Sequence, residues 1–390
     1  MIRVALVNPG LYPSPPTLGG AIEGHTYSLA NGLAELGYEV HFIADSSETT
    51  FPKNVIIHRI GFSLGSFSSG FAEDVLCNYF AGLKVWRTLE NFLRKERVDV
   101  LHFHHKVSGA MYAFNNRNVS LPIVYTAHNP LPSMFEYSPS KQAICQIPFK
   151  LLELGLIKSS NGVIAVSKRL ELELVQKYGI TPTKMFFVPN GVDTNVFSGN
   201  SRESDTTARK YGLPESFFLF LGKLEERKGA QFLLQALKQT EGYAVIVGDG
   251  PQRNKLKAMS KHLELEKRVV FTGSVSEKEK RGIYAKASAF VLPSLAEGLP
   301  VVVLEALATG LPIIATKGIA DEAIINGYNG FTFPPGNISF LKDRMALLWN
   351  DPELGKKLGK NSRKMALTEF GWRTIAEKVA EVYDHVITEN

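Results

Sequence analysis

The chain has 390 residues, 44% of them hydrophobic and 21% charged, and it carries a formal net charge of +6. This length exceeds what one ordinary hydrophobic core organises, so two domains are expected. No dense block of lysine and arginine occurs, and basic residues do not alternate with aromatic ones, which argues against nucleic-acid binding. The modest positive charge fits an anionic substrate or a loose contact with a membrane surface.

The expected location is the cytoplasm. The apolar run at residues 1–7 is too short for a signal peptide, and no run approaches the roughly 18 apolar residues of a transmembrane helix. Cys77 and Cys145 have no metal-binding or redox spacing, so free thiols in a reducing compartment are expected. Peripheral attachment to the cytoplasmic face of a membrane stays open.

Short β-branched runs alternate with helix-length amphipathic stretches along the chain, which is typical of parallel βαβ units. In the first half, this pattern predicts strands at residues 3–7, 39–43, 55–60, 98–103, 122–126, 162–166 and 185–188. Helices are expected between most of these strands, notably at residues 22–36, 75–95 and 168–178.

The second half repeats the pattern, with predicted strands at residues 217–221, 243–247, 269–272, 289–292 and 312–315. A polar stretch at residues 198–207 predicts a domain junction or an exposed loop near one. No short-period repeat is visible, which argues against solenoids and propellers. The expected fold class is α/β, with two Rossmann-like, doubly wound parallel sheets that face a central cleft and bind ligands at the carboxyl ends of their strands.

Two glutamates, Glu297 and Glu305, flank a predicted helix start at Gly298-Leu299-Pro300-Val301. Proline suits the first helical turn, and the free N–H groups and helix dipole there attract an anion such as a diphosphate. Glu305 is expected about 7.5 Å along the helix axis. The two carboxylates then accept hydroxyl groups on either side of a diphosphate, which is the layout of a nucleotide sugar. The alternative is a strand, turn and helix with two structural glutamates.

A cationic loop at residues 222–229 follows the first predicted strand of the second half and precedes a helix. It contains Lys223, Arg227 and Lys228. Cations at the carboxyl end of a strand are placed to neutralise phosphate. A charged surface loop with solvated lysines is the alternative.

Two further turns are candidates for ligand binding. Asp249 follows the next predicted strand, where it either faces the ligand or caps the helix that follows. Gly19 and Gly20 precede the first predicted helix, where they permit close approach of the backbone to a ligand or supply a positive φ for a sharp turn.

Histidines cluster after two predicted strands. His102, His104 and His105 belong to the first group, and His128 follows the next strand at the expected cleft, where a core or capping role is the alternative. A metal site at the first group lacks a paired acidic ligand, and no Asp-x-Asp motif offers ligands for a cation that bridges phosphates. No metal is therefore expected.

With these motifs placed, the chain resembles the GT-B glycosyltransferases over essentially its whole length, specifically the retaining glycosyl transferase group 1 superfamily (family 4). Its motifs follow the family's order: a glycine loop at 12–23, histidine segments at 99–104 and 126–129, a domain junction at 188–193, the phosphate loop at 222–229, the E-x7-E motif at 297–305 and Phe370-Gly371-Trp372. The resemblance implies an acceptor-binding domain at 1–190 and a donor-binding domain at 191–371. The resemblance also implies a last helix at 372–390 that crosses back onto the first domain, and its predicted apolar stripe is Ile375, Val379, Val382, Tyr383 and Val386.

The resemblance also implies roles for individual residues. The expected catalytic residues are Lys223 and Lys228 at the diphosphate, Glu297 at the donor-sugar hydroxyls and His128 beside the sugar. The expected donor-binding residues are Gly20, Gly222, Asp249, Gly298, Leu299, Pro300, Val301 and, at the ribose, Glu305. The expected acceptor-side residues are Gly19, Glu23, His104 and Asn129. In two departures, Lys223 replaces the family's usual arginine, which loses bidentate phosphate contact, and Asn129 replaces a frequent aspartate.

The implied reaction moves a sugar, with retention, from a nucleoside-diphosphate sugar to a hydroxyl acceptor such as a glycan, a lipid-linked molecule or a small molecule. UDP is the favoured nucleotide, and GDP and ADP are alternatives. No cofactor is expected, because the nucleotide sugar is a co-substrate. Two other interpretations stay open: a non-catalytic subunit that binds nucleotide sugars, and an epimerase or phosphorylase of similar fold.

Overall fold

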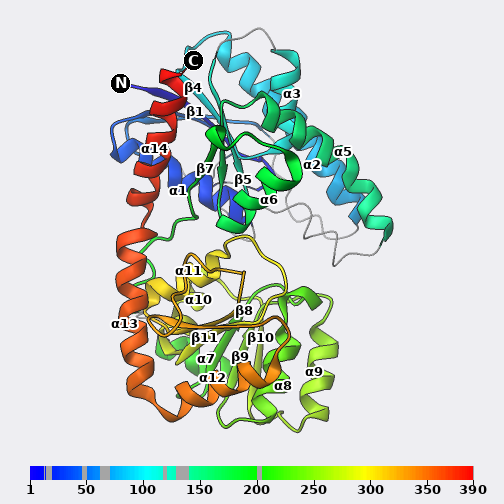
Figure 1. Cartoon of the computed structure of the whole chain (residues 1–390), viewed down its shortest axis with the longest axis vertical. Helices are drawn as coiled ribbons and strands as arrows, with labels where there is room; N and C mark the ends of the chain where they lie inside the picture. Colours follow the sequence, from blue (N-terminus) through cyan, green and yellow to red (C-terminus); the bar gives the residue numbers. More distant parts are fainter. Residues whose placement is uncertain are drawn as a thin grey trace. The chain divides into compact units, whose positions relative to one another are not determined.

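The computed structural model describes residues 1–12, 14, 20–45, 51–61, 71–116, 121–128, 140–199 and 204–389. The chain divides into two compact units, one formed by Met1–Gly191 with Trp372–Asn390 and the other by Val192–Gly371 (Figure 1). The division falls one residue after the expected bound of 190. Gly19 and Asn129 lie outside the described residues.

The first unit is built on a seven-stranded parallel sheet in the order β3-β2-β1-β4-β5-β6-β7. The strands are β1 (Arg3–Val7), β2 (Glu39–Ile43), β3 (Val55–His58), β4 (Val100–Phe103), β5 (Ile123–Ala127), β6 (Gly162–Ala165) and β7 (Met185–Phe187). The chain reverses direction across the sheet between β1 and β4, and ligands of such sheets bind at this switch point.

The helices of the first unit are α1 (Ala21–Glu35), α2 (Phe71–Leu93), α3 (Lys106–Asn115), α5 (Ser140–Ser159), α6 (Lys168–Tyr178) and α14 (Trp372–Thr388), with a short 3₁₀ turn at Pro182–Lys184. Successive side chains of a strand point to opposite faces of the sheet. Thus Val4 and Leu6 pack into a core shared with α1 and α14, and Ala5 and Val7 pack into a core shared with α2, α3 and α6.

The last helix, α14, packs on the first unit, as predicted. Its apolar stripe, Ile375, Val379, Val382, Tyr383 and Val386, is fully buried. Helix α14 lies closely against α1, because a Cβ added at Gly32 would be 2.9 Å from Cβ of Ala376. A glycine at this position of α1 therefore permits the close approach of the two helices.

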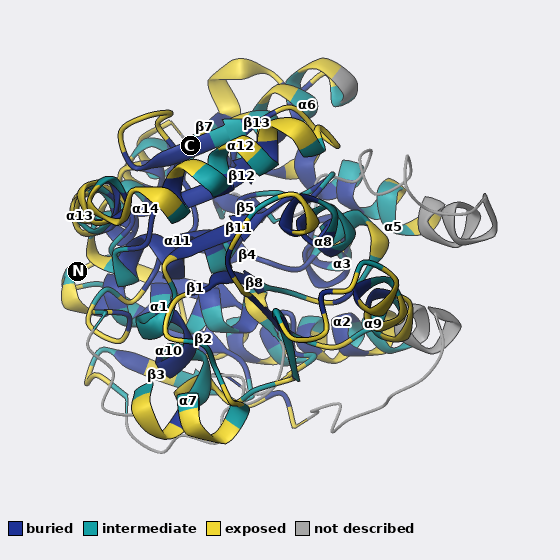
Figure 2. Cartoon of the chain, turned by 90° about the horizontal axis from the view of Figure 1, so that it is seen from below, coloured by how far each residue is buried: buried dark blue, intermediate teal, exposed yellow. Residues whose placement is uncertain are grey.

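The second unit contains a six-stranded parallel sheet in the order β10-β9-β8-β11-β12-β13. The strands are β8 (Phe218–Leu221), β9 (Ala244–Val247), β10 (Val269–Gly273), β11 (Ala289–Leu292), β12 (Ile313–Thr316) and β13 (Gly330–Phe333). The helices are α7 (Ser204–Tyr211), α8 (Ala230–Lys238), α9 (Arg253–His262), α10 (Glu277–Lys286), α11 (Val301–Thr309), α12 (Ile338–Asn350) and α13 (Pro352–Glu369), with a 3₁₀ turn, η2, at Glu226–Lys228. In both sheets, the strands are largely buried beneath helices with exposed outer faces (Figure 2).

The structure corrects two predictions for the second half. Of the two alternatives for residues 198–207, the structure excludes the domain junction, because the units divide at Gly191. The last four residues of this stretch, from Ser204, start helix α7. Strand β13 was missed, because its four residues follow a turn rich in Gly and Asn and offer too short a pattern. None of the described helices combines the length and the hydropathy of a membrane-spanning segment.

Candidate active site

Glu297 and Lys228 form an ion pair at the switch point of the second sheet, which lies between β8 and β11. Glu297 lies in the loop after β11, and Lys228 ends the turn η2 after β8; Nζ of Lys228 donates to Oε1 of Glu297. Nη1 of Arg227 lies 3.8 Å from Oε2 of the same carboxylate and donates to the carbonyl of Ala296. Only 10% of the Glu297 side chain is exposed, so these cations hold it in one orientation.

The backbone of the two loops fixes this ion pair. The N–H of Leu295 donates to the carbonyl of Arg227 at 2.7 Å. Gly229 adopts a φ of 75°, and a Cβ there would lie 2.0 Å from the carbonyl oxygen of Pro293. Only glycine fits this position without moving the loop. The close approach at Gly229 therefore places the preceding residue, Lys228, beside the loop that follows β11.

Lys223, in contrast, points outward. Its side chain is 66% exposed, and its Nζ lies 2.8 Å from Oε1 of Glu225. Burial acts to raise the pKa of Glu225, but Lys223 and Arg227 outweigh it and lower that pKa. At Gly222, an added Cβ would have the ring of Phe220 at 3.9 Å as its nearest neighbour among the described residues. The loop therefore presents two inner cations at Glu297, Lys228 and Arg227, and one outer cation, Lys223.

Helix α11 begins at Val301, and Pro300 is its N-cap, with φ −69° and ψ 124°. Pro300 therefore lies just before the first helical turn rather than in it, because its ψ is extended. No described side chain caps this helix end. Leu299 is buried in the core of the unit, so the segment from Gly298 to Val301 can offer a ligand mainly backbone groups and the positive end of the helix dipole.

Glu305 is the fifth residue of α11, as expected, and it is buried. Nζ of Lys280 donates to its Oε1 at 2.7 Å, and the hydroxyl of Tyr284 lies 3.0 Å from its Oε2. Burial raises the pKa of Glu305, and the charge of Lys280 opposes that shift. Both carboxylate oxygens of Glu305 already have partners on α10. A hydroxyl group of a ligand would therefore bind to a carboxylate whose orientation is already fixed. No local sequence pattern links Lys280 or Tyr284 to Glu305.

Asp249 forms a turn and an ion pair. Its Oδ1 accepts from the N–H of Gly250 at 2.8 Å, and its Oδ2 accepts from Nη1 of Arg253 at 2.9 Å. It does not cap α9, whose N-cap is Gln252. Of the two predicted roles, the structure excludes the helix cap.

In the first unit, Gly20 is the N-cap of α1 and adopts a left-handed conformation with φ 72°. This bears out its use for a sharp turn. Glu23, in the first turn of α1, is buried, and its Oε1 accepts from the N–H of Tyr12 at 3.3 Å. Burial raises the pKa of Glu23, and backbone hydrogen bonds oppose that shift.

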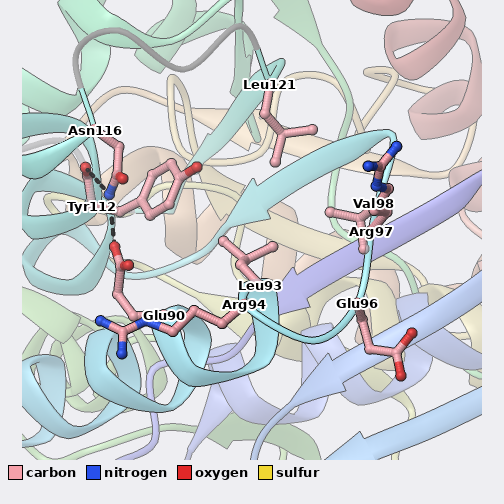
Figure 3. Close-up of a pocket in the computed structure, with 9 residues that line it drawn as sticks. All are labelled: Glu90, Leu93, Arg94, Glu96, Arg97, Val98, Tyr112, Asn116 and Leu121. Atoms are coloured by element: carbon pink, nitrogen blue, oxygen red, sulfur yellow. Dashed lines mark hydrogen bonds between the residues drawn. The ribbon is translucent and has the colours of Figure 1, made fainter.

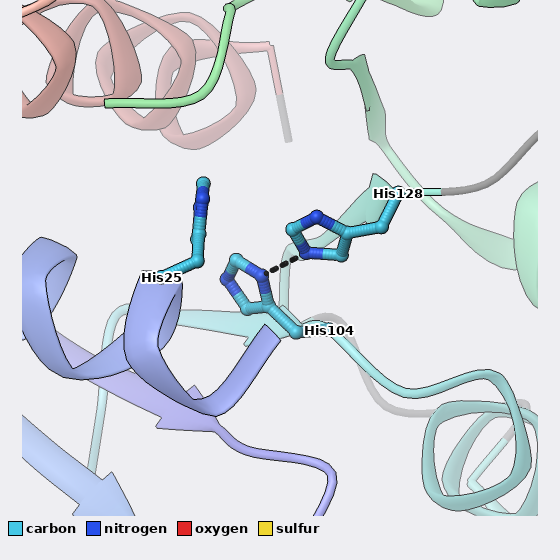
Figure 4. Close-up of side chains that lie close together, drawn as sticks. All are labelled: His25, His104 and His128. Atoms are coloured by element: carbon cyan, nitrogen blue, oxygen red, sulfur yellow. Dashed lines mark hydrogen bonds between the residues drawn. The ribbon is translucent and has the colours of Figure 1, made fainter. Parts of the chain in front are cut away.

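Three histidines, His25, His104 and His128, meet at the carboxyl ends of β4 and β5 (Figure 4). His25 comes from α1 and was not singled out in the sequence. Nδ1 of His104 and Nε2 of His128 are 2.9 Å apart. Burial lowers the pKa of all three rings, to about 4 for His25, so they are neutral at pH 7.

The sequence neighbours of His104 do not join it in a common ligand set. Nδ1 of His102 lies 2.6 Å from the hydroxyl of Tyr383, and its Nε2 lies 2.7 Å from Oγ1 of Thr126. His105 is the N-cap of α3. The structure therefore does not bring His102, His104 and His105 together as one ligand set. The ring of His102 lies 4.3 Å from that of His104 between centroids, but both nitrogens of His102 already contact hydroxyl groups.

A separate cavity of about 340 Å³ lies at the amino ends of β4 and β5 in the first sheet (Figure 3). Its walls come from the ends of α2 and α3 and from residues just before β4 and β5, namely Glu90, Leu93, Arg94, Glu96, Arg97, Val98, Tyr112, Asn116 and Leu121. His104 and His128 follow β4 and β5. The cavity thus lies at the amino ends of the strands, away from the histidines.

Two family models match successive parts of the chain. Residues 19–196 match the model described as Glycosyltransferase Family 4, and residues 203–365 match Glycosyl transferases group 1. The chain therefore belongs to the group 1 glycosyltransferases, and it is an enzyme of the GT-B fold.

Individual proteins agree with this assignment. A UDP-Gal:alpha-D-GlcNAc-diphosphoundecaprenol alpha-1,3-galactosyltransferase of Escherichia coli is 26% identical over 80% of this chain and 83% of its own length. The structure of sucrose-phosphate synthase from Thermosynechococcus elongatus superposes with a TM-score of 0.79 and 20% identity, covering 100% of both chains. HepE of Anabaena, solved in complex with UDP-glucose, gives a TM-score of 0.72 and 21% identity, covering 99% of this chain and 100% of its own. At these identities, the two structures support the fold alone.

Proposed function

We propose that the enzyme moves a sugar, with retention, from a UDP-sugar to a hydroxyl acceptor and needs no divalent metal. The ion pair of Lys228 and Glu297 at the switch point of the second sheet carries this proposal. Glu297 lies four residues before the start of α11, and its carboxylate can accept hydrogen bonds from sugar hydroxyls. Lys228 places a cation beside it. A helix N-terminus and a lysine suit a diphosphate, and a carboxylate suits sugar hydroxyls.

The second unit is the proposed donor-binding unit. Lys228, with Lys223 further out, neutralises the diphosphate, and the backbone of residues 298–301 donates to it. Glu297 holds hydroxyls of the sugar, and Glu305 holds those of the ribose. Gly222 and Asp249 border the same strand ends. UDP is favoured over GDP and ADP, because the E. coli relative is described as using UDP-Gal.

The first unit is the proposed acceptor-binding unit, with Gly20, Glu23 and His104 on the acceptor side and His128 in the transfer step. Gly19 and Asn129 keep their expected acceptor-side roles as part of the same proposal. The acceptor is a hydroxyl group of a glycan, a lipid-linked molecule or a small molecule. The proposed location remains the cytoplasm, with or without peripheral contact with a membrane.

The proposed chemistry is attack from the face that the diphosphate leaves. The bond between the anomeric carbon and the phosphate oxygen breaks, and the acceptor oxygen forms the new glycosidic bond. The acceptor proton passes to the departing phosphate oxygen. The protein contributes orientation and charge stabilisation, with Lys228 offsetting the charge that develops on the leaving group.

The test is to incubate the enzyme with UDP-sugars and a panel of hydroxyl acceptors, and to measure UDP release and the anomeric configuration of the product by NMR. An α-sugar donor should give an α-linked product. An inverted product would contradict retention. If the protein binds nucleotide sugar but releases no UDP with any acceptor, the non-catalytic subunit is favoured. If the sugar of the donor changes its configuration without transfer to an acceptor, the epimerase is favoured.

A further inference from the structure

The cluster of His25, His104 and His128 contains three imidazoles whose potential ligand nitrogens all lie within 4.8 Å of one another. They come from three elements: α1, the end of β4 and the end of β5. His25 and His104 are 7% and 3% exposed. The rings are therefore gathered by the packing of the fold rather than by a flexible surface.

Two nitrogens of this cluster are unsatisfied. Nδ1 of His25 and Nε2 of His104 are buried and have no hydrogen-bond partner among the described residues. Buried polar atoms without partners are rare in folded proteins, because leaving them unpaired is costly. A neutral imidazole carries a proton on one nitrogen and a free electron pair on the other, so each of these rings has one nitrogen that can bind a metal ion, and the tautomer decides which one.

The chemistry of the ligands selects the kind of ion. Neutral imidazole favours Zn²⁺, Ni²⁺, Cu²⁺ and Co²⁺, whereas Mg²⁺ and Ca²⁺ favour oxygen ligands. Three histidines with a fourth position open to water are a known zinc-binding arrangement. Zn–N bonds of about 2.0–2.1 Å place ligand nitrogens roughly 3.4 Å apart. The present separations range from 2.9 Å between His104 and His128 to at most 4.8 Å, so the side chains need to move only by about an ångström or less, the first pair apart and the others together.

We infer that His25, His104 and His128 form a binding site for a zinc-like divalent transition-metal ion, and that the bound ion inhibits sugar transfer. The inhibition rests on the proposed function, because a metal ion on His128 removes this side chain from the transfer step.

Binding changes one hydrogen bond. Nδ1 of His104 and Nε2 of His128 share a proton at 2.9 Å. If both nitrogens coordinate the ion, this proton has to leave the space between them. Nε2 of His104, which lacks a partner among the described residues, can receive it. The ion then replaces the proton as the link between the two rings.

The direct test uses the full chain without a histidine tag. Zn²⁺ affinity is measured by competition with a chromophoric chelator, and stoichiometry by elemental analysis after dialysis. We expect one Zn²⁺ per chain, and affinity at least about tenfold weaker in His25→Gln and His104→Gln, since even partners behind a ligand change metal affinity by 10–100-fold. His58→Gln is the matched control, because His58 also pairs with a histidine, His41, at 3.1 Å. Circular dichroism and thermal unfolding verify that each variant is folded.

Trp372 gives a second signal. Its ring lies 5.0 Å from that of His25. Ni²⁺ or Cu²⁺ in the site should quench Trp372 fluorescence, and Trp372→Phe should remove most of the quenching while keeping the affinity. Quenching that persists in folded His25→Gln and His104→Gln would overturn the site, as would unchanged Zn²⁺ affinity in both variants.

Activity separates the two parts of the inference. Inhibition by Zn²⁺ that a chelator reverses, and that follows the measured affinity, supports both parts. Stoichiometric Zn²⁺ binding with full transfer activity would overturn the inhibition while the site stands. Zn²⁺ binding in a chain that transfers no sugar would instead count against the proposed function.

Discussion

Lys228 and Glu297 are 69 residues apart in the sequence, yet they form a largely buried ion pair between the loops after β8 and β11. The side chains are only 17% and 10% exposed. A donor diphosphate would therefore meet a lysine that is already oriented by a carboxylate, and the sugar would meet a carboxylate that is already oriented by a lysine.

Replacing Lys228 should weaken nucleotide binding. Lys228→Ala removes a cation aimed at the diphosphate and leaves Glu297 with Arg227 alone. Loss of a charged hydrogen bond of about 1.5–3 kcal/mol corresponds to roughly ten- to a hundredfold weaker binding. Calorimetric titration with UDP measures this change in affinity. Lys238→Ala is the control, because Lys238 forms an exposed pair with Glu264; an equal loss in both variants would refute the role of Lys228.

Substitution of Glu297 and of Glu305 should affect different kinetic quantities. Glu297→Gln should chiefly lower kcat, because Glu297 is proposed to hold the reacting sugar. Glu305→Gln should chiefly weaken nucleotide binding, through the ribose. Each lost charged hydrogen bond is worth about 1.5–3 kcal/mol, or roughly ten- to a hundredfold. Steady-state kinetics with a nucleotide titration distinguishes them, and two variants that bind and turn over like the parent would show the motif to be misread.

Tyr284→Phe tests how Glu305 is held. The variant removes the hydroxyl that lies 3.0 Å from both Oε2 of Glu305 and the carbonyl of Val302. A buried acceptor left without its donor costs about 1–3 kcal/mol. Urea unfolding should show a loss of this size, together with weaker UDP binding. The comparison is Tyr243→Phe at a tyrosine that is 41% exposed; no difference between the two variants would contradict the network.

The strands and the main motifs could be predicted from the sequence, but the partners inside the site could not. Short runs of β-branched and other apolar residues locate strands such as β1 and β11 to the residue. The contacts of Glu305 with Lys280 and Tyr284 span 25 and 21 residues and depend on how α10 packs on α11. No local pattern encodes such pairs.

The histidine cluster illustrates the same limit. His104 and His128 could be placed at strand ends, because each follows a predicted strand. His25 could not be joined to them, since it lies inside α1 and reads as an ordinary helical residue. Only the packing of α1 over the carboxyl ends of β4 and β5 brings its ring within 5.2 Å of His104 and 4.8 Å of His128, measured between centroids.

Gly229→Ala should destabilise the second unit. The residue has a φ of 75°, and the added Cβ would lie 2.0 Å from the carbonyl oxygen of Pro293. Left-handed strain alone costs about 1–3 kcal/mol, and displacement of the loop adds to it. Gly212→Ala is the matched control, because its φ is 61° and no described atom lies within 4 Å of the added Cβ. Urea unfolding should show a larger loss for Gly229→Ala, and equal losses would contradict the tight contact.

The first unit should lose stability as the pH falls below 6.5. Burial lowers the pKa of His102 and of His105 from 6.5 to about 3 in the folded state. Between these values the unfolded chain binds protons that the folded chain does not, so stability rises with pH. Each such histidine contributes a slope of about 1.4 kcal/mol per pH unit.

Urea unfolding at pH 7 and at pH 5 measures this slope. His105→Gln should reduce it, whereas the slope should be unchanged in His262→Gln, because His262 lies exposed on α9. A slope that is the same in His105→Gln and the parent would contradict the buried, neutral state of His105.

Unfolding temperature recorded with UDP, GDP and ADP and their sugar conjugates, each with and without a chelator, tests the donor site most directly. A ligand that binds only the folded chain at a hundredfold excess over Kd stabilises it by about 2.7 kcal/mol, a shift of a few degrees for a chain of this size. We predict that the UDP series gives the largest shift, that the shift survives chelation, and that it shrinks in Lys228→Ala. The absence of a shift with every nucleotide, or a shift that requires a divalent ion, would contradict the proposed donor site.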